Sequence, residues 1–230
     1  MMHQIIIFGY DEYAKEIALA FKNTQTLIQI YLFDEFSCKQ AIDDGYTADL
    51  VELDDDWLDI KKKFNVHSLM CFCALADDAK NVFLTLSLRA QYPLLHIVSL
   101  ATSEQSAQKL RLAGATKAIA KLETTAHIIV ESLERPIAVK VLNEIIYEKN
   151  GLSMQEFTIL KDSALCEKDF SELLELSEDY EIIILTLYDK EKNMHFTYSN
   201  EVESLKLLEG SVLVIMGKDK DIQNFQKEVL

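Results

Sequence analysis

The first 120 residues alternate between short apolar runs and longer segments in which apolar residues recur every three or four positions. The apolar runs, rich in Val, Ile, Leu and Phe, lie at 5–8, 27–33, 50–53, 69–75, 97–100 and 117–119. The helical patterns between them lie at 11–22, 37–44, 57–64, 77–91 and 103–113. Continuous apolar runs are typical of strands covered on both faces, and their alternation with helices indicates βαβ units. The pattern predicts an α/β fold with a doubly wound parallel sheet.

The remaining residues show a different pattern of apolar positions. Apolar residues recur at helical spacing through 123–150, and Pro136 is expected to divide this segment into two helices that stop at Asn150-Gly151. Beyond it the sequence predicts a small α+β lobe, with strands at 156–160, 181–187, 195–198 and 212–216 and helices at 170–176 and 219–229. We therefore expect three parts: a Rossmann-like lobe at 1–122, a helical connector at 123–150 and a C-terminal lobe at 151–230.

Charge and hydropathy exclude several classes of function. The chain has 38 acidic and 23 basic residues and a net charge of −15, which disfavours binding to nucleic acid or to an anionic membrane surface. No apolar run approaches the roughly 20 residues that span a bilayer. The first residues show no basic segment followed by a signal-type apolar core, so we expect a cytoplasmic protein.

Residues that could catalyse a reaction or bind a metal are scattered. The four cysteines have no C-x-x-C spacing, and we interpret them as reduced thiols of the core: Cys38, Cys71, Cys73 and Cys166. The five histidines show no zinc-type spacing, and no serine lies in a nucleophile-elbow motif. We predict no catalytic residue and no metal site built on these side chains.

The first predicted strand leads into a turn where a dinucleotide-binding fold has G-x-G-x-x-G. Only Gly9 remains, since Asp11 and Ala14 occupy the second and third glycine positions, with Tyr10 between the first two. A carboxylate at Asp11 would repel phosphate and could itself accept hydrogen bonds from the amides of the first helix. Asp34 and Glu35, after the second strand, are placed where a ribose-binding acid is expected.

Six acidic residues cluster at 49–59, and two interpretations remain open. Carboxylates at this density could bind a divalent cation, although the spacing is not that of an EF-hand. Alternatively, they form an ordinary loop at a strand end, in which residues 54–56 cap a helix that begins at Trp57. The cluster comprises Asp49, Glu52, Asp54, Asp55, Asp56 and Asp59.

Both lobes resemble the RCK module, the cytosolic regulatory unit of bacterial potassium channels and of Trk/Ktr-type potassium uptake systems. The resemblance rests on four stretches of sequence: LADDAKN at 75–81, HIV at 96–98, AQKLRLAGA at 107–115 and LLEGSVLVIMG at 207–217. It implies a nucleotide cleft formed by Gly9, Tyr10, Asp11, Asp34, Glu35, Asp54, Leu75 and Ala76.

Several residues depart from the pattern of the RCK family. The G-D-A after the third strand is replaced by Glu52-Leu53-Asp54, and the basic residue common after the fifth strand aligns with Leu100. Each loss removes a charge-assisted contact worth roughly 1.5–3 kcal/mol. We therefore expect a degraded cleft with no tightly bound cofactor, and a weakly bound nucleotide, a divalent cation or an unphosphorylated nucleoside as the alternatives.

The resemblance implies a regulatory, gating-ring module that is not an enzyme. It would control potassium flux at the inner face of the cell membrane by acting on a channel pore or a translocating subunit, in the same chain or a separate one. It would assemble as a homodimer and further into an octameric ring. The apolar positions of 124–149 fit either a subunit interface or packing on the parent sheet. The rival hypotheses are an NAD(P)-dependent oxidoreductase and a ring that serves only as a structural scaffold.

Overall fold

The computed structural model describes residues 3–22, 26–146, 151–191, 193–198 and 205–229. The chain divides into two compact units, Met1–Val130 and Glu131–Leu230. The three-part division at 1–122, 123–150 and 151–230 stays a prediction.

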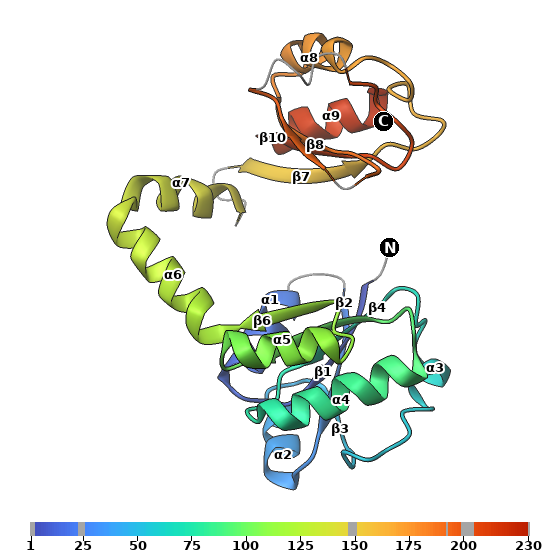
Figure 1. The fold of residues 1–230 in the computed structure, drawn as a ribbon, viewed down its shortest axis with the longest axis vertical. Helices are drawn as coiled ribbons and strands as arrows, with labels where there is room; N and C mark the ends of the chain where they lie inside the picture. The colour runs from blue at the N-terminus through green and yellow to red at the C-terminus, as the bar shows by residue number, and fades with distance from the viewer. Residues whose placement is uncertain (1–2, 23–25, 147–150, 192, 199–204, 230) are drawn as a thin grey trace. The chain divides into compact units, whose positions relative to one another are not determined.

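The first unit, blue to green in Figure 1, is built on a parallel sheet flanked by helices. The sheet has six strands in the order β3-β2-β1-β4-β5-β6. This order is that of dinucleotide-binding doubly wound folds, in which the chain reverses direction across the sheet between β1 and β4. The predicted fold class is therefore confirmed. The strands are β1 His3–Phe8, β2 Thr26–Leu32, β3 Thr47–Leu50, β4 Leu69–Cys73, β5 His96–Ala101 and β6 Lys117–Ala120.

Helices cover both faces of this sheet, which explains why its strands are continuously apolar. Along β1, Ile5 and Ile7 pack into one core with Ala14 and Ala18 of α1, whereas Ile6 and Phe8 pack into a second core on the opposite face. The second core includes residues of the loop before α3 and of α4. The helices are α1 Glu12–Lys22, α2 Glu35–Asp43, α3 Ile60–Lys63, α4 Asp78–Gln91 and α5 Glu104–Leu112.

The helix ends predicted from the sequence are confirmed for α5, and the predicted start of α3 is wrong. Ser103 caps α5 by accepting a hydrogen bond from the amide of Ser106, and Gly114 follows the helix with φ +99°. In contrast, α3 begins only at Ile60, because Trp57 has φ +55°, which is incompatible with a helix. The prediction that residues 54–56 cap a helix at Trp57 is wrong. The third strand is also displaced, ending at Leu50 where the prediction began it.

Strand β6 leads directly into the first of two consecutive helices. They are α6 Lys121–Glu134 and α7 Pro136–Ile146, so Pro136 divides the segment as predicted and occupies the first position of the second helix. Most of their apolar side chains are exposed: Leu122, Ile128, Ile129, Val130, Leu133, Ile137, Val141, Leu142 and Ile146. Ile145 is the buried exception among the described residues. Part of the predicted stop at Asn150-Gly151 lies outside the described residues.

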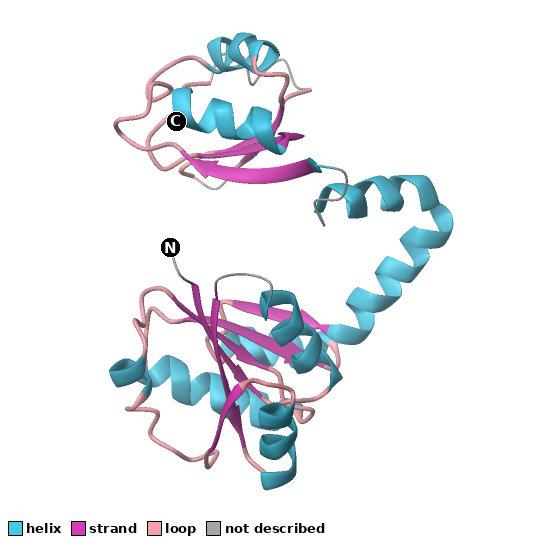
Figure 2. Ribbon diagram, turned by 180° about the vertical axis from the view of Figure 1, so that it is seen from behind, coloured by secondary structure: helices cyan, strands magenta, loops and turns pink. Residues whose placement is uncertain are grey.

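The second unit contains an antiparallel sheet with the order β7-β10-β8-β9. Figure 2 colours the strands of this unit magenta and its helices cyan. Its core combines Phe157, Leu213 and Ile215 of the sheet with Phe170 of α8 and Phe225 of α9. The predicted helix at 219–229 matches α9, whereas β7 begins four residues before its predicted start. The elements are β7 Leu152–Thr158, α8 Phe170–Asp179, β8 Ile183–Tyr188, β9 Met194–Phe196, β10 Val212–Lys218 and α9 Asp219–Val229. Within the described ranges, no helix has the length and apolar character that a membrane span needs.

Candidate ligand cleft

A cavity of about 290 Å³ opens at the carboxyl ends of β1, β2 and β4. Parallel doubly wound sheets bind ligands at this edge, where the direction of the strand order changes. The turn after each of these three strands contributes to the wall. Six of the eight predicted site residues line this one cavity: Gly9, Tyr10, Asp11, Asp34, Leu75 and Ala76.

The other two predicted site residues lie elsewhere. Glu35 lines an adjacent cavity together with Asp34 and Glu52. Asp54 is exposed in the loop after β3 and lines neither cavity. The assignment of all eight residues to a ligand stays a prediction.

Gly9 is required by the backbone geometry of the cleft. Its φ is +107°, and a Cβ at this position would lie 2.6 Å from the carbonyl oxygen of Ala74. The amide of Gly9 donates a 3.1 Å hydrogen bond to the carbonyl of Tyr31, which ties the end of β1 to β2. The first glycine of the motif therefore keeps a structural role even though the second is absent.

Asp11 occupies the N-terminus of α1 with its own side chain. Its Oδ1 accepts a 2.9 Å hydrogen bond from the amide of Ala14, as the sequence predicted. Its Oδ2 lies 3.7 Å from Nζ of Lys121, at the start of α6. A bound phosphate would need these same amides, so the carboxylate stands in its place.

The other two helices that begin at the cavity are capped in the same way. Asp34 accepts a 2.8 Å hydrogen bond from the amide of Ser37 in α2. Asp77 accepts hydrogen bonds of 2.7 and 3.2 Å from the amides of Ala79 and Lys80 in α4. The partial positive charge of each helix N-terminus is thus already paired with a carboxylate, which leaves the cavity unfavourable for an anion.

A buried asparagine, whose contacts the sequence did not predict, fixes the shape of the cleft. Asn81 donates from Nδ2 to the carbonyls of Leu75 and Leu100, at 2.9 Å each, and its Oδ1 accepts from the amide of Leu75 at 3.0 Å. Leu100 itself lies inside β5 and is buried in the core with Ile5 and Ile7. The predicted fifth run ends at Leu100, and the strand continues by one residue to Ala101, so Leu100 lies inside the strand.

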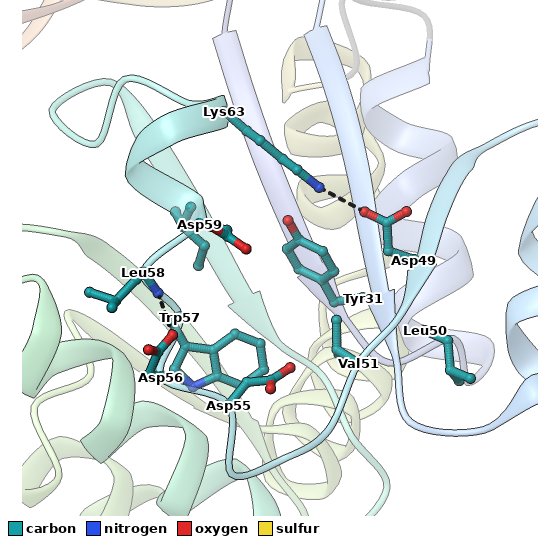
Figure 3. Close-up of a pocket in the computed structure, with 11 residues that line it drawn as sticks. Tyr31, Asp49, Leu50, Val51, Asp55, Asp56, Trp57, Leu58, Asp59 and Lys63 are labelled. Atoms are coloured by element: carbon teal, nitrogen blue, oxygen red, sulfur yellow. Dashed lines mark hydrogen bonds and ion pairs between the residues drawn. The ribbon is translucent and has the colours of Figure 1, made fainter.

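A second cavity, of about 350 Å³, lies beside the acidic loop after β3 (Figure 3). Nζ of Lys63 lies 3.0 Å from Asp49 and 5.9 Å from the centre of the Tyr31 ring. Burial raises the pKa of Tyr31, and the charge of Lys63 opposes that rise in part. The hydrogen bond from Lys63 to Asp49 raises the pKa of the lysine.

Four of the six acidic side chains at 49–59 have partners within the chain, and Asp49 is one of them through Lys63. Asp59 pairs with Lys62 at 2.7 Å, and Asp56 accepts a 3.1 Å hydrogen bond from the amide of Leu58. Asp55 accepts another, also 3.1 Å, from the amide of Glu52. No three His, Cys, Asp or Glu side chains within the described ranges are grouped so as to hold a metal ion. The contacts favour the interpretation of residues 49–59 as a loop over that of a cation site.

Comparison with known proteins gives one family. Residues 5–121 match the TrkA-N domain family. The chain is 26% identical over 179 residues to Potassium channel protein 1 of Methanocaldococcus jannaschii, covering 74% of this chain and 54% of that protein. The chain therefore spans about half the length of this curated relative.

Solved structures also match this chain at low sequence identity. The TrkA-N domain of the inner membrane protein ybaL from Escherichia coli is 13% identical, with a TM-score of 0.50 over 58% of this chain and 98% of that one. The GsuK RCK domain is 17% identical, with a TM-score of 0.48 over 98% of this chain and 46% of that one. Because the family match covers more than half of the 230 residues, the chain belongs to the TrkA-N domain family.

Proposed function

We propose that this chain regulates potassium flux as a gating-ring module at the inner face of the cell membrane. Its partner would be a channel pore or a translocating subunit, in the same chain or a separate one. The observation that carries the proposal is the TrkA-N match over 5–121, supported by the similarity to a potassium channel protein. The work of such a module is mechanical coupling and involves no catalysis.

Regulation requires two conformations that differ in their affinity for a ligand or for another subunit. A ligand with equal affinity for both conformations shifts nothing, however tightly it binds. The cleft at the ends of β1, β2 and β4 is the place where a ligand would act. Its self-capped helix N-termini support a cleft with no tightly bound cofactor, in which a nucleotide binds weakly.

Assembly would proceed through homodimers to an octameric ring. The exposed apolar side chains of α6 and α7 support the dimer, since a monomer would leave this surface in water. Val141 and Leu142 lie about one turn before Ile146 on α7, and each of the three side chains is about half exposed or more. A second copy of this segment would bury them.

The oxidoreductase hypothesis is not favoured by any feature of the cleft. It needs a turn that holds a pyrophosphate, and Asp11 occupies that turn. With simple carbonyl substrates, the rate of NADH oxidation should equal the blank.

Deletion of the gene in its native host tests the proposal. The initial rate of rubidium tracer uptake, or its response to a change in external potassium, should differ from that of the parent strain. The intact chain should restore the parent behaviour, whereas a variant with a disrupted dimer surface should not. Identical uptake in the parent and the deletion strain would contradict the proposed role.

A further inference from the structure

The carboxylate that fills the anion position of the cleft is held from two sides. One oxygen of Asp11 accepts from the amide of Ala14 at 2.9 Å, and the other lies 3.7 Å from Nζ of Lys121. Lys121 is the first residue of α6, the helix that leads out of the first unit. The contact therefore joins the turn after β1 to the first residue of α6, across 110 residues of sequence.

Lys121 is enclosed rather than free in solvent. Its side chain is only 11% exposed, and Nζ lies 4.7 Å from the centre of the Tyr13 ring. Its charge also reaches Asp78: burial would raise the pKa of that carboxyl, but hydrogen bonds from Ser106 and Thr102 and the charge of Lys121 together lower it. Lys121 is thus a cation held beside the position that a ligand phosphate would occupy. Leu100, which aligns with the basic residue common in the family, is apolar and buried and supplies no charge there.

A second contact fixes the same turn of α6. The carboxylate of Glu123 accepts a 3.1 Å hydrogen bond from the amide of Glu104, at the N-terminus of α5. The first turn of α6 is therefore anchored at the starts of two helices, by Lys121 at α1 and by Glu123 at α5. Of these two anchors, only the one through Lys121 involves a residue that lines the cleft.

We propose that Asp11 and Lys121 form an autoinhibitory pair, in which the carboxylate acts as a built-in substitute for a ligand phosphate and the lysine is its counterion. This inference rests on the proposed function only in treating the cleft as the regulatory site. A phosphate that displaces Asp11 takes over both the amides of α1 and the charge of Lys121. Occupancy of the cleft thereby changes what holds the first turn of α6.

Physical chemistry favours replacement of the Asp11 carboxylate by a ligand phosphate over a carboxylate that only keeps phosphate out of the cleft. Carboxylate and phosphate compete for the same amides at a helix N-terminus, and the carboxylate has the advantage of being tethered. Removing it frees the amides and leaves Lys121 without its partner on α1. The lysine then strengthens phosphate binding through a charge-assisted contact. Lys121 should therefore matter for ligand affinity only when Asp11 is absent.

A double-mutant cycle with ADP tests the pair. Titration calorimetry is carried out on the full chain and on Asp11→Gly, Lys121→Gln and the double variant, with Asp11→Asn as a second form that keeps the helix cap but removes the charge. We expect weak or undetectable ADP binding by the parent and by Lys121→Gln. Asp11→Gly should bind at least about tenfold more tightly, and Lys121→Gln in that background should remove most of the gain. The matched control is Lys117→Gln, an exposed lysine of β6, which should leave the gain intact.

Two results would overturn the proposal. One is no gain in ADP affinity in either Asp11 variant, and the other is a gain that survives Lys121→Gln. Amide exchange over residues 121–124 gives a second readout: ADP should change it in Asp11→Gly and leave it unchanged in the double variant. Neither measurement involves a membrane partner or potassium flux, so failure here is distinct from failure of the regulatory role.

Discussion

Asn81 of α4 and Leu100 of β5 are joined by a 2.9 Å hydrogen bond in the interior of the first unit. The Asn81 side chain is fully buried and also holds both backbone groups of Leu75. One side chain therefore connects the turn after β4 to the neighbouring strand. These hydrogen bonds fix the position of the turn that forms one wall of the cleft.

Replacing Asn81 by Ala should destabilise the first unit by about 2–4 kcal/mol, because one buried amide and two carbonyls lose their partners. The fluorescence of Trp57, the single tryptophan and a buried residue of this unit, reports its unfolding in urea. The matched control is Lys80→Ala, the adjacent exposed residue of α4, which should change stability by less than about 0.5 kcal/mol. Equal urea midpoints for the parent and Asn81→Ala would show that the three hydrogen bonds contribute nothing.

The dimer surface is best tested at Leu142 and Ile146, which lie one turn apart on α7 and are 49% and 61% exposed. Ile145, an obvious choice from the sequence, is only 8% exposed, so a charge there would disturb folding as well as assembly. Leu142→Asp with Ile146→Asp should convert a dimer into a folded monomer in sedimentation experiments. Asn143→Asp adds a charge at an adjacent exposed position and should leave the dimer intact. A parent chain that sediments as a monomer at micromolar concentrations would contradict the dimer itself.

The order of elements was predictable wherever burial makes the sequence periodic. Strands β1, β4 and β5 are buried on both faces and appear as continuous apolar runs, which is why a parallel sheet could be inferred. Strand β7 is different, because exposed and buried positions are mixed along it and its inward residues include Ser153. Its first half therefore showed no apolar run, and the predicted start was late.

In the cleft, contacts between residues close together in sequence could be predicted, whereas contacts between residues far apart in sequence could not. The cap by Asp11 follows from residue type and position alone, since it links residues three apart. The contacts of Asn81 with Leu100 and of Lys121 with Asp11 join segments far apart in sequence, and no local pattern indicates them. The end of β5 was predicted one residue early, at Leu100, because the apolar run itself does not mark the residue at which the strand stops.

The buried cysteines should resist alkylation in the folded protein. Burial raises the pKa of the Cys73 thiol to about 11, although hydrogen bonds with Ser99 and Thr85 oppose the rise in part. At pH 8 only about one thiol in a thousand would then be the reactive thiolate. Iodoacetamide followed by mass spectrometry should label the half-buried Cys38 and Cys166 first, and should label Cys71 and Cys73 only after denaturation. Early labelling of Cys73 in the native protein would contradict its burial.

The hairpin between β8 and β9 should carry an unusually acidic carboxyl group. His195 lies 2.8 Å from Asp189, and this hydrogen bond, with others from Asn193, lowers the pKa of Asp189 from 3.8 to about 2. A carboxyl whose folded pKa is lowered stabilises the fold above its unfolded pKa of about 3.9, and this contribution disappears as the pH falls through the folded value.

His195→Ala should therefore shift the Asp189 titration in carboxyl NMR spectra upward, toward 3.8. The variant should be less stable than the parent at neutral pH, and the difference should narrow as the pH falls from about 4 toward the folded pKa. His96→Ala removes an exposed histidine of the first unit and should leave the titration of Asp189 unchanged. If Asp189 titrates at the same pH in the parent and in His195→Ala, the backbone and side chain of Asn193 alone account for its acidity.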